Sequence, residues 1–181
     1  MKVLVFVGSL RAAAFSRKLA QAVVGLAPDG AECEFADGRD LPLYDQDLDG
    51  EEKPASVQAL LDQVTAAEAL VFVTPEFNYG IPGPLKNAID WASRPAYNSP
   101  LKGKPSWVIG LSLSPLGGVR AHDQLQTVLS GTLTPTLLGP SFLVPAVHEK
   151  FDGDGALTDE LTKARIERTW PAFLEWSKAQ G

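Results

Sequence analysis

Short apolar runs alternate along this chain with segments whose apolar residues recur at helical spacing. Runs of four to six apolar or alternating residues, bounded by Gly, Pro or polar positions, are typical of strands, and the continuous ones of buried parallel strands. The predicted strands cover residues 3–7, 32–35, 70–73, 107–111 and 142–144.

Apolar positions at i, i+3, i+4 and i+7 predict helices between these strands. Ser16 is a suitable N-cap for the first helix, and Pro54 suits the first turn of the second. Pro171 is expected to kink or break the last helix. Strands alternating with helices imply a parallel sheet covered on both faces. The later helical stripes lie at residues 57–64, 85–92, 125–129 and 166–174.

The loop at residues 75–85 follows the third predicted strand and leads into a helical pattern. Its Pro and Gly residues expose main-chain polar groups at the end of a parallel strand, where open α/β sheets bind ligands. Phe77, Asn78 and Tyr79 supply two aromatic rings and an amide, which suit a flat ligand such as a flavin. An ordinary strand-to-helix connection uses similar turn residues, so the loop alone leaves both interpretations open.

The segment after the first predicted strand has the features of a phosphate cradle. Ser9, Arg11 and Ser16 lie between the strand and the predicted helix. Unpaired N–H groups at a helix N-terminus attract anions, and hydroxyl and guanidinium groups add further contacts. The segment lacks both the Gly-x-Gly-x-x-Gly pattern and a Gly-Lys-Ser/Thr ending, which leaves a monophosphate as the expected ligand.

Together, the two loops resemble the NAD(P)H-dependent FMN reductases, which are flavodoxin-like enzymes that include quinone, azo-dye and chromate reductases. The likeness rests on Gly-Ser-Leu-Arg at residues 8–11, Pro-Glu-Phe-Asn-Tyr at 75–79 and Pro-Leu-Lys-Asn-Ala-Ile-Asp-Trp at 84–91. Shorter matches extend it over nearly the whole chain, at residues 41–45, 117–120 and 151–159.

The chain departs from the family pattern in two loops. Ala14 stands where many members carry Ser, and Ser16 where they often carry Asn, so one phosphate contact falls to the backbone or is absent. Ser114 and Pro115 stand where relatives often have Gly, which puts the close approach of this loop to a flavin in doubt.

The resemblance implies an α/β, flavodoxin-like three-layer fold with a five-stranded parallel sheet in the order 2-1-3-4-5. It implies FMN as cofactor and NAD(P)H as co-substrate, with electrons passing to a small-molecule acceptor such as a quinone, azo compound, chromate or free flavin. The flavin carries the chemistry, so no catalytic side chain is expected. The implied cofactor-binding residues are Ser9, Arg11, Phe15, Ser16, Pro75, Glu76, Phe77, Asn78, Tyr79, Gly80, Ser112, Gly117 and Gly118.

A second function remains open at this stage: a flavodoxin-type FMN carrier that passes single electrons between protein partners. The 75–91 motif favours the reductase, because it is typical of that branch. His122 is expected to be a capping or surface residue, and His148 to lie in a loop, where it is free or near the cofactor. The resemblance also implies a homodimer or homotetramer, since the helix near Pro84 often packs against another subunit in this family.

Composition narrows the remaining classes of function. The 181 residues, without linker or repeat, predict a single domain spanning 1–181. A net charge of −6 disfavours nucleic acid as a partner. Cys33 is the only cysteine, so the chain cannot form an internal disulfide, and its alternating surroundings predict a half-buried strand residue.

Neither a metal site nor a membrane segment is expected. The acidic stretch at residues 45–52 is typical of a solvated loop, and the turn at 152–155 lacks the full ligand spacing of a calcium loop. No apolar run approaches the roughly 20 residues that span a bilayer, and the N-terminal run is too short for a signal-peptide core. These features predict a cytoplasmic protein.

Overall fold

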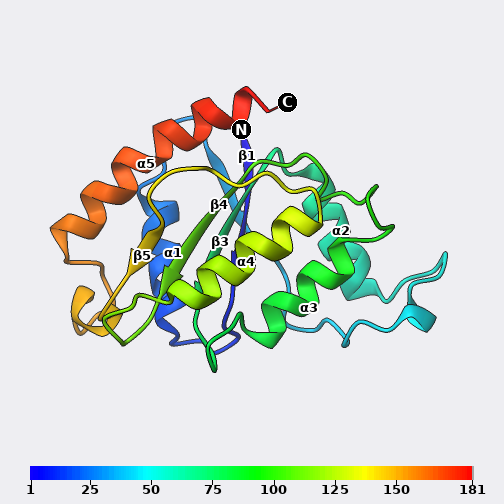
Figure 1. Cartoon of the computed structure of the whole chain (residues 1–181), viewed down its shortest axis with the longest axis horizontal. Coiled ribbons are helices and arrows are strands. Elements are labelled where there is room, and N and C mark those ends of the chain that lie inside the picture. Colours follow the sequence, from blue (N-terminus) through cyan, green and yellow to red (C-terminus); the bar gives the residue numbers. More distant parts are fainter. Residues whose placement is uncertain (181) are drawn as a thin grey trace.

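The computed structural model describes residues 1–180 and has the predicted alternation of strands and helices (Figure 1). The strands are β1 (Lys2–Val7), β2 (Glu32–Phe35), β3 (Ala69–Pro75), β4 (Ser106–Leu111) and β5 (Phe142–Val144). The α-helices are α1 (Phe15–Gly25), α2 (Ala55–Ala66), α3 (Gly83–Ala92), α4 (Val119–Gly131) and α5 (Glu160–Lys178). Two short 3₁₀ helices are η1 (Gln46–Leu48) and η2 (Val147–Lys150).

The five strands form one parallel sheet in the order β2-β1-β3-β4-β5. Val5 pairs with Val71 of β3, and Val71 pairs with Trp107 of β4. This order confirms the expected flavodoxin-like fold. From β1 the chain adds β2 on one side and then β3 on the other, so the strand order reverses between β1 and β3. Sheets of this kind bind ligands in the crevice at the carboxyl ends of these two strands.

Two apolar cores pack against the opposite faces of the sheet. Successive strand residues point to opposite faces, so Val71 and Val73 join the core beneath α1 and α5. Leu70 and Phe72 join the other core, which α2, α3 and α4 cover. In Figure 1, α3 and α4 lie across the front of the strands. The result is the expected three-layer arrangement.

Two expectations about helix starts are wrong, and the last helix does not break at Pro171. Ser16 is not the N-cap of α1, because the helix begins at Phe15 and Ala14 occupies the cap position without a side-chain hydrogen bond. Pro54 precedes α2 as its N-cap instead of lying in the first turn. Helix α5 continues through Pro171, where Trp170 and Phe173 are fully buried on either side. Their packing outweighs the one main-chain hydrogen bond that proline removes.

Trp91 of α3 is a core residue. It is fully buried, its Nε1 donates a hydrogen bond to the Pro42 oxygen over 2.8 Å, and its ring meets that of Tyr44 edge-on. Cys33 is half-buried in β2, as expected, and burial raises the pKa of its thiol. None of the helices within residues 1–180 is both long and apolar enough to cross a membrane.

Candidate functional site

A cleft of about 1100 Å³ opens at the carboxyl ends of β1, β3 and β4. The loop after β1, the first turn of α1, the loop after β3 and the loop after β4 form its walls. This is the position that the strand order predicts for a ligand site. The lining residues are Ser9, Leu10, Arg11, Ala14, Phe15, Ser16, Pro75, Glu76, Phe77, Asn78, Tyr79, Pro84, Leu111, Ser112, Leu113, Ser114, Leu116, Arg120 and Val147.

One end of the cleft is formed by the N-terminus of α1. In the first turn of α1 the Arg17 N–H donates to the Ala14 oxygen, and no side chain caps the N–H groups before it. The loop before the helix is folded locally, because the Arg11 N–H donates to Ser9 Oγ and the Arg11 guanidinium donates to the Ala13 oxygen. The positive end of the helix dipole and the exposed Arg11 together favour an anion.

Ser16 has an unpaired hydroxyl at this end of the cleft. The residue is 1% exposed, and its Oγ has no hydrogen-bond partner among the described residues. A buried hydroxyl without a partner costs free energy. Because Ser16 also lines the cleft, a ligand oxygen bound there would supply the missing partner.

The loop after β3 makes a tight turn beside the cleft. Phe77 and Gly80 exchange two main-chain hydrogen bonds of 3.0 Å, and the central residues Asn78 and Tyr79 both have positive φ, at 49° and 65°. Positive φ at both central positions is characteristic of type I′ turns and is strained for a residue as bulky as tyrosine. The turn therefore stores strain at the wall of the cleft.

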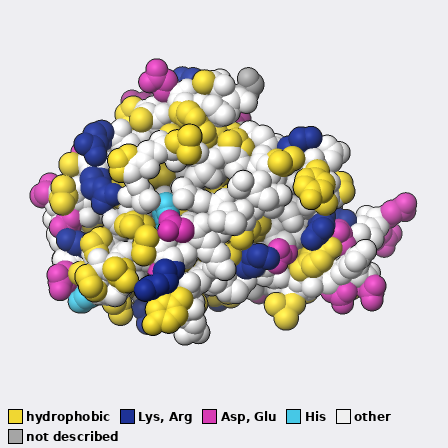
Figure 2. All heavy atoms as spheres, viewed as in Figure 1, with side chains coloured by type: hydrophobic (Ala, Val, Ile, Leu, Met, Phe, Trp, Pro, Cys, Tyr) yellow, Lys and Arg dark blue, Asp and Glu magenta, His cyan; other side chains and the backbone are white. Residues whose placement is uncertain are grey.

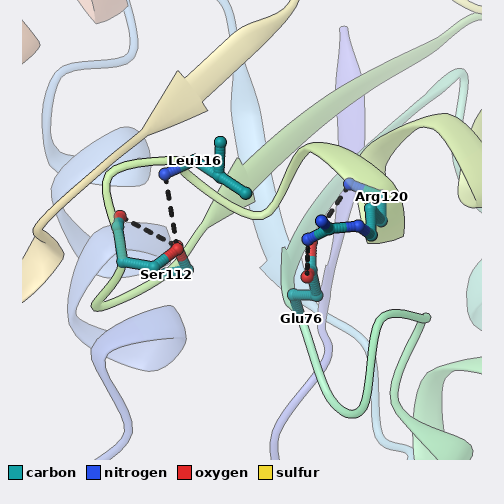
Figure 3. Close-up of polar contacts among 5 residues, drawn as sticks. Glu76, Ser112, Leu116 and Arg120 are labelled. Atoms are coloured by element: carbon teal, nitrogen blue, oxygen red, sulfur yellow. Dashed lines mark hydrogen bonds and ion pairs between the residues drawn. The ribbon is translucent and has the colours of Figure 1, made fainter.

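An ion pair ties this turn to α4. Glu76 accepts the main-chain N–H of Arg120 over 3.0 Å and the Arg120 guanidinium over 3.2 Å (Figure 3). The Arg120 guanidinium also lies 4.6 Å from the centre of the Tyr79 ring. Glu76 lies at the N-terminus of α4, where a carboxylate is favoured. The contacts fix the turn, so the Glu76 side chain already has partners within the protein.

Serine hydroxyls close the loop after β4 on itself. Ser112 Oγ contacts Ser114 Oγ at 2.9 Å and donates to the Ser114 oxygen, while Ser114 Oγ accepts the Leu116 N–H (Figure 3). The side chains of Leu113 and Leu116 remain 61% and 47% exposed. This loop therefore adds an apolar, open rim to the cleft.

The cleft brings together all but three of the residues that the sequence assigns to the cofactor. Gly80, Gly117 and Gly118 are not among its lining residues. A Cβ on Gly118 would lie 2.6 Å from the Leu111 oxygen, and Gly118 has φ of 80°. This glycine is therefore required by the packing of α4 on β4 and by its left-handed backbone.

Sequence reasoning did not assign several lining residues to the cofactor, most of them apolar. Leu113 and Leu116 lie in a loop without periodicity, and Val147 begins η2, far along the chain from the two motifs. No pattern in the sequence signals that these side chains reach the cleft. Arg120 belongs to the matching residues 117–120, but the sequence gives its side chain no position. The complete set is Leu10, Ala14, Pro84, Leu111, Leu113, Ser114, Leu116, Arg120 and Val147.

The two histidines lie outside the cleft lining. The expectation that His122 is a cap or surface residue is wrong: it is 2% exposed, within α4, with Nδ1 3.3 Å from Asp123 Oδ1. Its Cβ lies close to Gly110 of β4, which has no side chain to exclude it. His148 lies in η2 with its side chain 47% exposed. Among residues 1–180, no three His, Cys, Asp or Glu side chains gather as a metal site would require.

Comparisons with known proteins agree with this geometry. The family model described as NADPH-dependent FMN reductase matches residues 1–149. An NAD(P)H-dependent FMN reductase of Pseudomonas aeruginosa is 37% identical over 176 residues, or 97% of this chain and 95% of that protein. A 2-hydroxy-1,4-benzoquinone reductase of Burkholderia sp is 35% identical over 176 residues, or 97% of this chain and 96% of the relative.

A solved structure is similar over almost its full length. The flavoenzyme NAD(P)H:(acceptor) oxidoreductase FerB from Paracoccus denitrificans superposes with a TM-score of 0.90 at 36% identity, covering 99% of this chain and 98% of that one. The family match extends over most of the chain and includes all three loops that build the cleft. On this evidence, the chain belongs to the NADPH-dependent FMN reductase family.

Proposed function

We propose that this protein is an NAD(P)H-dependent FMN oxidoreductase that passes two electrons to quinones or similar small acceptors. The observation that carries the proposal is the cleft itself, which combines an anion-binding helix end with an unpaired buried hydroxyl and an apolar opening. The family membership and the names of the relatives support the same activity. Neither observation favours an electron carrier.

The residues present fit the phosphate end of FMN. Ser16 Oγ lacks a partner among residues 1–180, the first-turn amides of α1 are uncapped, and Arg11 lies beside them. A phosphate would accept from all three kinds of donor. Ala14, which stands where many relatives carry Ser, has no hydroxyl to contribute, so these donors hold the phosphate.

The strained turn and the loop after β4 would hold the flavin ring. FMN, when bound, accepts a hydride from the nicotinamide and delivers electrons to the acceptor. The side chains of the cleft would bind and orient the cofactor and the substrates. They offer no free acid or base, because no histidine lines the cleft and Glu76 is engaged with Arg120. The proposed contact residues are Ser9, Arg11, Phe15, Ser16, Pro75, Glu76, Phe77, Asn78, Tyr79 and Ser112.

The exposed rim supports a shared position for NAD(P)H and the acceptor. Phe77 and Tyr79 are 49% and 74% exposed, and the two leucines of the facing loop are also exposed. A flat, open and mostly apolar rim imposes little selectivity, which fits quinones and other planar acceptors. Arg11 and Arg120 line the cleft, and either guanidinium could select NADPH by its 2′-phosphate.

Steady-state kinetics test the proposal. With FMN bound, NAD(P)H oxidation should require no second protein. Varying NADPH and a quinone should give parallel double-reciprocal lines, because NADPH and the quinone would occupy the same position in turn. Intersecting lines would contradict the shared position. Bound FMN without NAD(P)H oxidation would favour the electron carrier, and failure to bind FMN would overturn the assignment of the cleft.

A further inference from the structure

A second cavity lies at the open edge of the sheet and shares no lining residue with the cleft. Strand β5 pairs only with residues 109–111 of β4. On its β5 side, the first half of β4 therefore lacks a paired strand, and a single bridge joins Ser106 to Thr136. The segment 136–141 lines a cavity of about 540 Å³ there, together with β4, α4 and α5. This volume is within the usual range for small-molecule sites.

One wall of this edge cavity is aromatic. Trp107 and Phe142 both line it, and their rings meet edge-on with centroids 5.4 Å apart. Leu137 and Ala172 add aliphatic surface beside them. Trp107 and Phe142 are only 2% and 5% exposed, so this wall offers little of either ring, and the half-buried Leu137 supplies the more accessible apolar surface. A small planar apolar group suits such a surface.

Another wall is cationic. Arg165 donates from Nη1 to the Leu143 oxygen over 2.9 Å, and its guanidinium lies 4.3 Å from the centre of the Phe142 ring. Burial lowers the pKa of Arg165, and the nearby charge of Arg168 lowers it further. Dark blue Lys and Arg side chains lie beside yellow hydrophobic ones over this part of α5 in Figure 2.

The positive charge of the edge cavity has no counterion in the described chain. No Asp or Glu is among its lining residues. Arg168 makes no hydrogen bond or ion pair with any residue from 1 to 180. His122 also lines the cavity, and within the same residues its ring is bonded only through Nδ1, to Asp123. Two guanidinium groups without a carboxylate, beside an aromatic wall, are the complement of an aromatic acid.

We propose that the edge cavity binds a small aromatic carboxylate, with the acid group on Arg168 and Arg165 and the ring over Leu137, beside the exposed edges of Trp107 and Phe142. Arg165 is already fixed by its main-chain contacts and presents its charge in one place. Arg168 is free to close on the carboxylate. This inference does not depend on FMN or on the proposed activity, because the two sites have separate walls.

The test is a titration of the purified protein with benzoate, followed by amide shifts in two-dimensional ¹H–¹⁵N NMR spectra. Benzamide, which has the same shape without the charge, is the matched ligand control. Saturable shifts are expected at residues 136–142 and 165–172 with benzoate, and about tenfold weaker binding with benzamide, the loss typical of one charge-assisted hydrogen bond. Shifts at residues 75–80 instead would mean that benzoate enters the cleft.

Arg168→Gln is the matched variant, because Arg168 makes no contact that the fold needs. It should weaken benzoate binding about tenfold, whereas Lys163→Gln, which removes a positive charge from the same helix outside the cavity, should leave it unchanged. The proposal is overturned if benzoate gives no saturable shift at the edge cavity, if benzamide binds equally well, or if the two variants behave alike.

Discussion

Ser16 and Tyr79 occupy positions that stability alone does not favour. Ser16 buries an unpaired hydroxyl, and Tyr79 adopts a left-handed backbone conformation at the tip of a turn. Each costs the fold on the order of 1–3 kcal/mol. Both residues line the cleft. A bound cofactor would give the Ser16 hydroxyl a hydrogen-bond partner and would lie against the turn that Tyr79 shapes. Residues that cost stability at a site are typical of functional positions.

Ser16→Ala separates binding from stability. Removing an unpaired buried hydroxyl should leave thermal stability unchanged or slightly higher, while FMN affinity falls about tenfold through loss of a hydrogen bond to phosphate. The measurements are a melting curve and a fluorescence titration with FMN. Ser177→Ala is the control, because Ser177 Oγ is also buried and unpaired but lies outside the cleft. Equal FMN affinity in both variants would contradict the role of Ser16.

Gly118 and Gly131 lie just before and at the end of α4 and differ in what surrounds them. Gly118 has φ of 80° and would place a Cβ 2.6 Å from the Leu111 oxygen, whereas a Cβ on Gly131 meets nothing within 4 Å. We expect Gly118→Ala to lower the free energy of unfolding by about 2 kcal/mol or more. Gly131→Ala should be neutral or slightly stabilising. Urea unfolding of both variants checks this, and equal midpoints would argue against the close packing.

At the scale of elements, the sequence predicted strands more closely than helix ends. Each strand is a short apolar or alternating run, and each was found within two residues of its expected bounds. The ends of α1 and α2 were misplaced, because capping by Ala14 and Pro54 leaves no side-chain signal. The break expected at Pro171 did not occur, since long-range packing of Trp170 decides that region.

The same distinction holds for the site. Pro75 to Tyr79 were predictable because they form a dense motif at one strand end. The leucines of the loop after β4 were not, because their direction depends on serine hydrogen bonds that close the loop. The pairing of Glu76 with Arg120 joins positions 44 residues apart, which no local pattern reveals.

The link between the β3 turn and α4 should matter more for binding than for stability. Glu76→Gln keeps the shape and removes the charge, so we expect stability to fall by about 1 kcal/mol or less. FMN affinity should fall about tenfold, because the turn forms a wall of the cleft. Calorimetric titration with FMN measures the effect. Glu175→Gln, on α5 and outside the cleft, is the control, and a similar affinity in both variants would contradict the positioning role.

Helix α5 should depend on pH through its N-cap. Hydrogen bonds from Thr162 and Lys150 lower the pKa of Asp159 to about 2. A carboxyl with a lowered pKa in the fold stabilises it above the unfolded value near 4, and this contribution is lost as pH falls from about 4 to 2. Asp159→Asn should therefore be less stable at neutral pH and show a shallower loss in acid. Urea midpoints across this range measure it, and parallel pH curves would contradict the assignment.

At the scale of the whole molecule, association with further copies remains a prediction. Trp91 cannot anchor an interface, because it is fully buried. Leu43 lies in the loop that packs on α3 and is 83% exposed. Tyr97 lies in the loop that follows α3 and is 72% exposed. Single exposed apolar side chains are common on monomers, so the homodimer or homotetramer rests on the family resemblance, and Leu43 offers a place to test it. The cytoplasmic location also stays a prediction.

Leu43→Glu tests the association. If the surface near α3 is an interface, the variant should shift the molar mass measured by light scattering towards the monomer, because a buried carboxylate without a partner is costly. Leu161→Glu changes an equally apolar residue that is 70% exposed on α5, and it should leave the mass unchanged. A monomeric unmodified protein, or an unchanged mass for Leu43→Glu, would contradict the expectation.

The cleft at the carboxyl ends of the sheet is the proposed FMN site, and the most direct measurement is anaerobic rapid mixing of the FMN-loaded protein with NADPH or NADH. We predict that the oxidised-flavin absorbance disappears fully in one fast phase without any second protein, and that the faster nucleotide identifies the preferred reductant. Absorbance that persists with FMN bound would contradict the reductase activity.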